Sequence, residues 1–259
     1  MELDLKDKVV LVTGGSKGIG LACARAFIAE GAKVAIVSRS KVNLTVAARE
    51  LGKDRVLALA VDLVQPAAAR AVVAEVEAKL GPVDVLVNSA GAAKRTPPED
   101  LTNESWRAAM DAKYFTYVHA IDAVIKGMAA RGHGAIVNIV GTGGKVANPI
   151  HLPGGAANAA LMLVTSGLAK AYGRKGVRVN AVNPGSVMTD RVKGALEAEA
   201  KLAGITEAAA QQANEARIPL GRYGTAEEIA NVVLFLASGR SGYVNGAVLT
   251  ADGGTSGAL

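Results

Sequence analysis

Short apolar runs alternate with segments of helical periodicity along this chain of 259 residues. Residues 8–12 (KVVLV) form an uninterrupted β-branched run, as expected of a strand buried on both faces of a parallel sheet, and residues 19–29 then repeat apolar side chains at helical spacing. Further strands are predicted at residues 33–38, 55–61, 83–87, 135–140 and 246–250. Because strands that alternate with helices imply right-handed βαβ units, the pattern predicts an α/β fold, a doubly wound parallel sheet of about seven strands with helices on both faces.

No Pro- or Ser-rich linker and no charge run divides the sequence, and half of its residues are apolar, enough for one large core. We therefore expect a single domain over residues 1–259. The longest apolar stretches, such as residues 232–237, are far shorter than the roughly 18 residues of a membrane span. The start MELDLKDK also lacks the basic-then-apolar order of a secretory signal. A cytoplasmic protein with no membrane partner is expected.

The turn between the first predicted strand and helix, residues 13–20 (TGGSKGIG), contains closely spaced glycines. Glycine permits positive φ and lets the backbone approach a ligand without an intervening Cβ. The first N–H groups of the following helix and the positive end of its dipole face the same point. We expect a phosphate group there; the alternative is a plain strand-to-helix turn that binds no ligand.

This turn resembles the TGxxxGxG loop of the short-chain dehydrogenase/reductase family, and the resemblance covers essentially the whole chain. Residues 88–91 (NSAG) are similar to the family's NNAG, residues 184–189 (PGSVMT) match its PGxVxT segment, and residues 252–254 (DGG) match its end. The resemblance implies a Rossmann-like fold, a nicotinamide dinucleotide and hydride transfer on a small molecule. The residues implied for cofactor binding are Gly14, Ser16, Lys17, Gly18, Ile19, Gly20, Ser38, Arg39, Asp62, Leu63, Asn88, Ser89, Ala90, Gly91, Pro184, Gly185, Val187 and Thr189.

The end of the second predicted strand distinguishes the two nicotinamide cofactors. In dinucleotide folds an acidic side chain there accepts hydrogen bonds from the free 2′-hydroxyl of NAD(H), but residues 38–40 (SRS) contain no acid. Arg39 can pair with the 2′-phosphate of NADP(H) through its planar fork, and Lys17 can add a second positive charge. NADP(H) is therefore favoured over NAD(H), unless both side chains are ordinary surface cations.

Two further positions carry implied contacts. Asp62 and Leu63 resemble the pair that the family places against the adenine ring, although Asp62 can also cap the helix that starts after Pro66. Asn88 is expected to bridge neighbouring strands, and the small residues after it let the cofactor lie close.

The resemblance fails at the four residues with which the family transfers hydride, an Asn, a Ser, a Tyr and a Lys. Local spacing places those positions at Lys113, Gly141, Gly154 and Asn158. Reduction of a carbonyl needs a proton donor within hydrogen-bond reach of the developing alkoxide, and a tyrosine supplies it near neutral pH only when a nearby cation lowers its pKa. Glycine can do none of this, so a divergent member with an atypical active site is expected.

Two features indicate replacement of these groups. Lys113 and Asn158 look like an exchange of the family's Asn and Lys, which keeps one ammonium and one carboxamide in that corner; the alternative is a solvated lysine on a helix. A set of glycines is also expected to empty both walls of the pocket: Gly141, Gly143, Gly144, Gly154 and Gly155. Because glycines early in a helix are costly, the adjacent pair Gly154 and Gly155 indicates a need for space.

The proton donor is the least determined part of the site. His151 lies just before the emptied Tyr position and titrates near neutrality. Thr142, Lys145 and Tyr114 are further candidates, and each can instead be a loop or packing residue. The predicted catalytic set comprises Lys113, Thr142, His151 and Asn158, with no metal ligands.

Composition excludes little but does constrain the partners. The net charge is +6, yet Lys and Arg are scattered with few aromatics between them, so a solvated surface is expected and not a nucleic-acid interface. The single cysteine, Cys23, lies inside the first predicted helix and is expected to fill the core.

Residues 189–217 are rich in Ala, Glu and Lys with a helical pattern, and the resemblance places the family's substrate-covering segment there. Residues 225–230 (TAEEIA) predict a capped helix. A homo-oligomer, most simply a tetramer, is expected. The leading function is an NADP(H)-dependent oxidoreductase with an atypical site acting on a carbonyl or alcohol of a small organic substrate. The alternatives are a non-redox enzyme (lyase, dehydration or proton transfer) and a non-catalytic nucleotide-binding protein.

Overall fold

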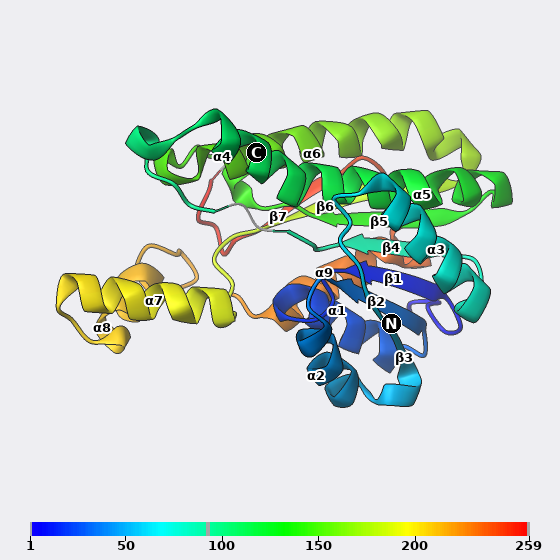
Figure 1. Ribbon diagram of the computed structural model, residues 1–259, viewed down its shortest axis with the longest axis horizontal. Coiled ribbons are helices and arrows are strands. Elements are labelled where there is room, and N and C mark those ends of the chain that lie inside the picture. The colour runs from blue at the N-terminus through cyan, green and yellow to red at the C-terminus, as the bar shows by residue number, and fades with distance from the viewer. Residues whose placement is uncertain (1, 92–93, 258–259) are drawn as a thin grey trace.

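All strands of the computed structural model, which describes residues 2–91 and 94–257, form one sheet (Figure 1). The seven parallel strands take the order β3-β2-β1-β4-β5-β6-β7. Their bounds are β1 (Val9–Thr13), β2 (Lys33–Ser38), β3 (Val56–Ala60), β4 (Val85–Asn88), β5 (Gly134–Ile139), β6 (Val177–Pro184) and β7 (Val248–Ala251). After β3 the chain returns to the other side of β1, so the strand order reverses between β1 and β4. The predicted doubly wound, Rossmann-like sheet is confirmed.

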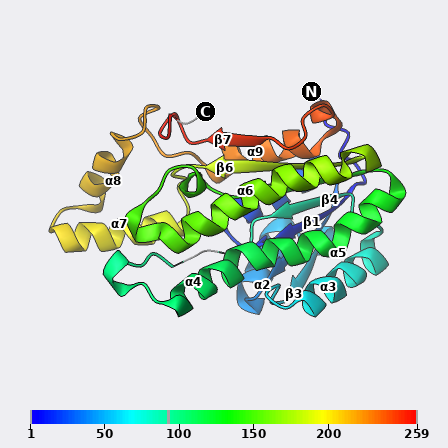
Figure 2. The same ribbon diagram turned by 90° about the horizontal axis from the view of Figure 1, so that it is seen from above.

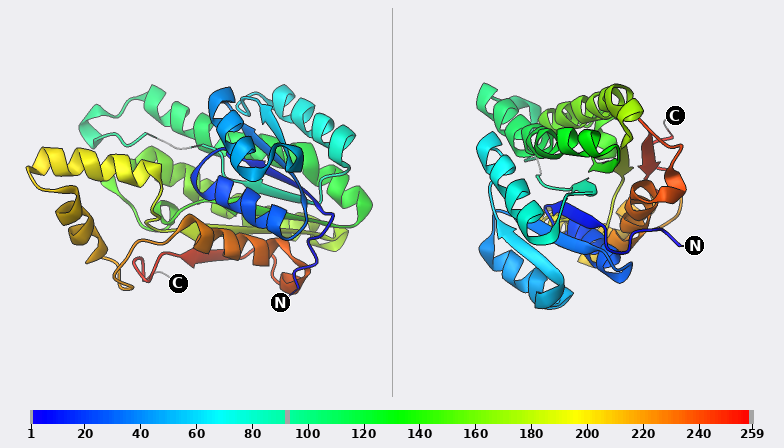
Figure 3. Two further views of the ribbon diagram at one scale, coloured as in Figure 1. Left: turned by 90° about the horizontal axis from the view of Figure 1, so that it is seen from below. Right: turned by 90° about the vertical axis from the view of Figure 1, so that its right-hand side faces the viewer.

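Helices cover both faces of this sheet, as the end-on view of Figure 3 shows. One face carries α1 (Gly18–Ala29), α2 (Lys41–Leu51) and α9 (Ala226–Ala237), and the other carries α3 (Pro66–Leu80), α5 (Thr116–Arg131) and α6 (Leu152–Tyr172). Along β1, Val10 and Val12 belong to the first core, whereas Val9 and Leu11 belong to the second. Burial on both faces explains why the strands read as uninterrupted apolar runs.

The helix α6 belongs to a long apolar helical segment. Residues 149–175 are long and apolar enough to cross a membrane, by length and composition only. In the fold, however, α6 packs against β6 and buries Leu161, Thr165 and Ala169. Its apolar residues are those of a core helix. The expectation that every apolar stretch is too short for a membrane span was wrong for this helix.

Two helices extend away from the sheet at the left of Figures 1 and 2, α7 (Asp190–Ala203) and α8 (Glu207–Glu215). A small cluster of its own holds them together, with Leu196 and Ala200 from α7 and Ala210 from α8. The predicted helical segment 189–217 is therefore a helix pair, which Gly204 interrupts with a φ of +67°.

The start and end of α9 are both fixed by side chains. Thr225 Oγ1 accepts a hydrogen bond from the Glu228 N–H at 3.1 Å, and the Glu228 carboxylate accepts one from the Thr225 N–H at 2.8 Å, which confirms the predicted cap. At the other end, the Arg178 guanidinium of β6 donates to the carbonyls of Leu236 and Ser238. The helix is thereby anchored to the sheet.

Cys23 belongs to the buried face of α1 and is fully buried in the core. Burial raises the pKa of its thiol to about 12, so the reactive thiolate is not populated near neutral pH. The expectation that Cys23 fills the core is confirmed.

Candidate active site

The glycine-rich turn joins β1 to α1 at the C-terminal edge of the sheet. Gly14 has a φ of +68°, and a Cβ there would lie 2.6 Å from the carbonyl oxygen of Ser89; at Gly20 a Cβ would lie 2.4 Å from the carbonyl oxygen of Gly14. Both glycines are thus required by packing within the protein. Lys17 is the N-cap of α1 and forms no side-chain cap, which leaves the first N–H groups of the helix to a ligand or solvent.

Two other implied segments meet this turn. Thr13 Oγ1 accepts hydrogen bonds from the N–H groups of Ser89 and Ala90 at 3.1 and 3.2 Å, which ties the end of β1 to the end of β4. Thr189, the N-cap of α7, has its Cγ2 atom 3.5 Å from the position that a Cβ of Gly18 would take. The structure therefore brings the glycine-rich turn, the NSAG segment and the PGSVMT segment together.

A cavity of about 130 Å³ opens beside the turn. Arg39 lines it, is exposed and forms no ion pair with any residue that the structure describes. The lining residues that were implied for cofactor binding are Gly14, Ser38, Arg39, Asp62, Leu63, Ala90 and Gly91. These residues form a hollow with the free guanidinium of Arg39 at its rim.

Asp62 does not cap the helix that follows it. Its Oδ1 atom accepts a hydrogen bond from the Val64 N–H at 3.1 Å, and the N-cap of α3 is Gln65, which forms no side-chain cap. The alternative role considered for Asp62 is therefore wrong, because the helix starts too far downstream for the carboxylate to reach its N–H groups.

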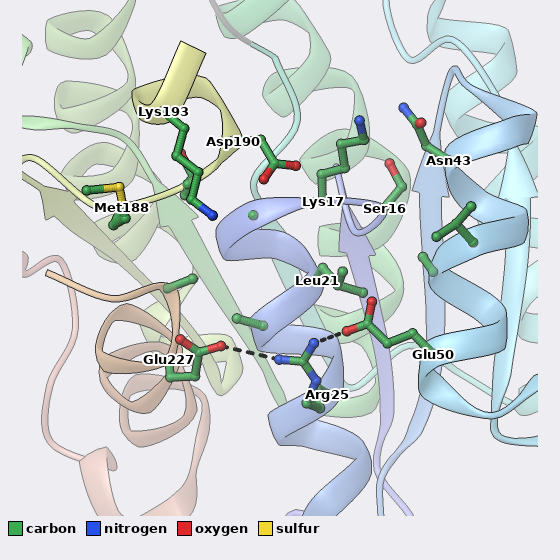
Figure 4. Close-up of a pocket in the computed structure, with 16 residues that line it drawn as sticks. Ser16, Lys17, Leu21, Arg25, Asn43, Glu50, Met188, Asp190, Lys193 and Glu227 are labelled. Carbon is green, nitrogen blue, oxygen red and sulfur yellow. Dashed lines mark hydrogen bonds and ion pairs between the residues drawn. The ribbon is translucent and has the colours of Figure 1, made fainter. Parts of the chain in front are cut away.

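Lys17 lines a different hollow, an adjoining groove of about 530 Å³. Figure 4 shows Lys17 towards the top of this groove and Arg25 towards the bottom, between Glu50 and Glu227. Arg25 forms ion pairs with both carboxylates, 3.3 Å from Glu227. Because Lys17 and Arg39 line separate hollows, their joint contact with one phosphate stays a prediction.

A buried chain of polar side chains crosses the sheet beneath the site. Thr13 Oγ1 donates to Asn88 Oδ1 at 3.3 Å, Asn88 Nδ2 donates to Asn138 Oδ1 at 3.0 Å, and Asn138 Nδ2 donates to Thr165 Oγ1 at 2.9 Å. The expected bridging by Asn88 is confirmed and reaches α6. The sequence analysis missed Asn138 and Thr165; an Asn within the apolar run AIVNIV was the available signal.

Lys113 is buried, with 8% of its surface exposed. It lies in the π-helical turn η3 (Met110–Phe115), which joins α4 (Asn103–Ala109) to α5, and such turns are frequent at functional sites. Its Nζ atom donates to Tyr117 Oη and to the Ile139 carbonyl oxygen, both at 2.9 Å. The alternative of a solvated helix lysine is wrong, because the ammonium lies at the last residue of β5.

Tyr117 is a further component that the sequence analysis missed. Its Oη atom donates to the Ile139 carbonyl oxygen at 2.7 Å, and its ring is fully buried in a cluster with Val140 and Leu161. The available signal was the spacing of four residues from Lys113, which places the two side chains on one helix face. A tyrosine on an apolar helix face is nevertheless common in protein cores.

Gly141 follows β5 with a φ of +125° and a ψ of +146°. This region is essentially restricted to glycine, so the backbone here is unsuited to a serine. The Gly141 N–H donates to Asn183 Oδ1 at 3.3 Å, which fixes the strand end. The main chain at this position thus favours glycine.

Asn158 and His151 lie against the turn that Gly141 begins, η4 (Thr142–Gly144). Asn158 is only 6% exposed, and its Nδ2 atom lies 3.2 Å from the Cβ position of Gly141 and 3.7 Å from that of Gly143. The Cδ2 atom of His151 lies 3.4 Å from the same Cβ position of Gly143. Three of the predicted catalytic residues, Thr142, His151 and Asn158, therefore gather at this turn, and Lys113 lies just upstream of it, at Ile139.

Two of the glycines around the turn are required by close packing. A Cβ at Gly144 would lie 2.7 Å from the Ala159 nitrogen, and one at Gly155 would lie 2.7 Å from the Gly143 carbonyl oxygen. These two glycines allow close packing of the turn against α6, so the expectation that they empty the pocket is wrong. Gly154 is buried in the first turn of α6.

The remaining proton-donor candidates make contacts close to the same strand end. The Lys145 Nζ atom donates to Thr250 Oγ1 of β7 at 3.4 Å, and Thr250 pairs with Asn183, the residue that binds the Gly141 N–H. The Tyr114 ring packs edge-on against Phe115, with 5.2 Å between the ring centroids, and against the cluster that contains Val140. Lys145 and Tyr114 therefore stay candidates beside His151 and Lys113.

Comparison with known proteins gives the same assignment for most of the chain. The family model described as enoyl-(acyl carrier protein) reductase matches residues 14–256. D-Threitol dehydrogenase of Mycolicibacterium smegmatis is 34% identical over 252 residues, which cover 96% of this chain and 93% of the relative. This chain belongs to the short-chain dehydrogenase/reductase family.

Solved members of the family share the complete fold. The L-sorbose reductase of Gluconobacter frateurii, solved with NADPH and L-sorbose, aligns over 100% of both chains with a TM-score of 0.94 and 32% identity. A gluconate 5-dehydrogenase of Burkholderia cenocepacia, solved with NADP and tartrate, covers 100% of this chain and 98% of its own, with a TM-score of 0.88 and 32% identity. The chain is therefore placed among dehydrogenases and reductases of small carbonyl and alcohol compounds.

Proposed function

We propose that this protein is an NADP(H)-dependent oxidoreductase with an atypical active site, acting on a carbonyl or alcohol of a small organic substrate. The observation that carries the proposal is the turn after β1, which ends in uncapped N–H groups of α1 and whose Gly14 lines a cavity with the free cation Arg39 at its rim. This arrangement fits a dinucleotide, with the diphosphate at the helix start and a 2′-phosphate near Arg39. When bound, the cofactor supplies the hydride.

The choice of NADP(H) rests on charge. No acid follows β2, and Arg39 and Lys17, the latter within the glycine-rich turn, are exposed cations that line adjoining hollows. The two solved relatives described above hold NADPH and NADP. Because an arginine fork binds a phosphate well and an acid would repel it, NADP(H) is the cofactor that these residues suit.

The atypical active site rests on the four positions where the family pattern and this chain differ. Lys113, Gly141, Gly154 and Asn158 leave the site without the hydroxyl acids of the pattern. We infer that the proton comes from a relocated group, Lys113 at the end of β5 or His151 at the turn 142–144, since each side chain has a nitrogen that can donate a proton and both lie at this strand end.

The rest of the chain would support this reaction. We infer a single domain in which α7 and α8 cover the substrate, because Thr189 at the start of α7 lies beside the glycine-rich turn, with its Cγ2 atom 3.5 Å from the position that a Cβ of Gly18 would take. We also infer a cytoplasmic homotetramer; light scattering that shows a monomer at micromolar concentration would contradict the assembly. A panel of ketoses and polyols is the first set of substrates to assay.

The decisive experiment is a pair of fluorescence titrations with NADPH and NADH. NADPH should bind more tightly, and Arg39→Asp should reverse or abolish the preference because it replaces a phosphate partner with a repelling charge. Arg49→Asp, which makes the same charge change at the far end of α2, is the matched control and should preserve it. Equal curves for the two nucleotides in the unmutated protein would sink the assignment of NADP(H), and no binding of either would sink the oxidoreductase.

A further inference from the structure

We propose that Asn158 and the first N–H groups of the turn η4 form a site that donates hydrogen bonds to a substrate oxygen, that of a carbonyl or a carboxylate. The proposal rests on the proposed function, because the oxygen would belong to the same substrate. It assigns the binding of that oxygen, as distinct from its protonation, to particular residues.

The first argument is the state of the Asn158 carboxamide. The residue is only 6% exposed, and its side chain forms no hydrogen bond with any residue that the structure describes. Its amide atoms are not among the fully buried polar atoms that lack a partner, so its hydrogen bonds are left to solvent or to a ligand. Its Nδ2 atom lies 3.2 and 3.7 Å from the Cβ positions of Gly141 and Gly143, where no side chain intervenes.

The second argument is the main chain of the turn that the amide faces. The N–H groups of Gly144 and Lys145 bond to the carbonyls of Gly141 and Thr142 at 3.3 and 2.8 Å. Over the described part of the chain, the N–H groups of Thr142 and Gly143 have no acceptor. Two main-chain donors and one carboxamide thus lie around the same short turn.

The chemical class of the ligand follows from these groups. All three offer N–H donors, so the ligand atom must accept hydrogen bonds, and an sp² oxygen with full or developing negative charge accepts several at once. The Lys113 ammonium at the neighbouring Ile139 carbonyl adds a positive field on the same strand end. A carbonyl that is being reduced and a carboxylate share this chemistry.

Asn158 would therefore act differently from Lys113 and His151. A carboxamide holds and polarises an oxygen but does not transfer a proton near neutral pH, whereas the other two groups titrate. Loss of Asn158 should weaken binding of the oxygen without moving the pH dependence of turnover. The pH dependence thus separates the two roles.

The test follows the amide signals of the protein by ¹⁵N NMR, with the protein saturated with NADP⁺ and, separately, without nucleotide. Sodium acetate is the carboxylate probe and cyclohexanone is the ketone probe. We expect the side-chain amide of Asn158 and the backbone amides of Thr142 and Gly143 to shift along one saturation curve for at least one probe. The probe whose titration saturates identifies the class of oxygen, carboxylate or ketone.

Variants then assign the donor. Asn158→Leu should weaken the bound probe at least about tenfold, in line with the loss of a donor to a charged oxygen, and Asn158→Asp should abolish acetate binding by repulsion. Asn103→Leu, on the exposed first turn of α4, is the matched control and should change nothing. The proposal is overturned if neither probe shifts the three signals in the unmutated protein, or if a folded Asn158→Leu binds equally well. Failure of NADP⁺ to bind would instead count against the proposed function. The titration without nucleotide would still test the oxygen site in that case.

Discussion

Two turns of this molecule end a parallel strand with a glycine at positive φ, and they differ in what requires the glycine. After β1, Gly14 is packed so closely that a Cβ would lie 2.6 Å from main-chain oxygen. After β5, a Cβ at Gly141 would meet only the amide of Asn158, at 3.2 Å, while its φ of +125° still excludes other residues. The first turn is fixed by the packing of the fold, and the second by its own main-chain conformation.

The difference also concerns chemistry. The turn after β1 matches the family pattern and leaves helix N–H groups for a phosphate, as its relatives would require. The turn after β5 gathers an ammonium, an imidazole and a carboxamide, with the Tyr117 hydroxyl beside the ammonium. The two turns therefore offer different chemistry on one sheet, which is why function has to be argued from the site.

The largest difference between the two turns is expected in turnover. Lys113→Met and His151→Ala should each lower turnover about 100- to 10,000-fold if that residue supplies the proton, and should leave NADPH affinity nearly unchanged because neither lies at the glycine-rich turn. Steady-state rates on the first ketose or polyol that the enzyme accepts, with fluorescence titration of NADPH, measure both. Lys170→Met, an exposed lysine late in α6, is the control. Losses below about threefold for both variants would exclude them as essential acids and favour the non-redox or non-catalytic alternatives.

The next largest effect is expected on folding at the first turn. Gly14→Ala should lower the free energy of unfolding by about 3 kcal/mol or more, because the Cβ meets main-chain atoms in addition to the strain at positive φ. Gly132→Ala, at a φ of +77° with nothing within 4 Å of the Cβ, should cost only about 1–2 kcal/mol. Urea unfolding measures both. Equal losses of unfolding free energy in Gly14→Ala and Gly132→Ala would mean that packing does not fix the turn after β1.

A smaller effect is expected at the second turn. Gly141→Ser should cost about 1–3 kcal/mol from its backbone conformation. Gly143→Ser should cost less than about 1 kcal/mol, because its Cβ would make only ordinary contacts, at 3.4 Å or more. Thermal unfolding of the two variants compares them, and an equally stable Gly141→Ser would disprove the conformational restriction.

The same variants bear on catalysis. Lys113→Asn, Gly154→Tyr and Asn158→Lys restore three of the family's groups, and addition of Gly141→Ser restores the fourth. We expect the quadruple variant to be less stable than the triple one for the reason just given. If either variant folds and reduces simple ketones while the unmutated protein does not, the scaffold presents the nicotinamide productively. No gain in a folded quadruple variant would count against that view.

The smallest effect is expected at α9, away from both turns. The Arg222 side chain and the Thr225 N–H hold the pKa of Glu228 down to about 2, against 4.5 for an unperturbed group. Since the folded pKa is lowered, the stabilisation is present above pH 4.5 and is lost as the pH falls toward 2. Glu228→Gln should therefore be less stable than the unmutated protein at neutral pH, with the gap closing in acid. A gap that is independent of pH would contradict this account, and NADPH affinity should not change.

Much of the fold could be predicted from the sequence because its strands are buried on both faces and read as apolar runs. The strand β6 was not located, and its residues show why. Arg178, Asn180 and Asn183 interrupt the apolar pattern, yet their polar groups bond to the main chain of the segment 236–247 and to Gly141. Long-range hydrogen bonds of this kind leave no mark in a local pattern.

The candidate site could be predicted in part. The spacing of the family motifs located Lys113, Gly141 and Asn158, and the structure gathers them at one strand end. The burial of Lys113 could not be foreseen, because it depends on a π-helical turn and on Tyr117. Nor could the role of Gly155, whose neighbour is a main-chain oxygen twelve positions earlier in the chain.

The backbone of Gly141 also limits how this site could be redesigned. At a φ of +125° a serine side chain would be strained before it could work, so a serine there needs a second change that rotates the end of β5. A designer who wants a hydroxyl at this position must therefore change the main chain before the side chain.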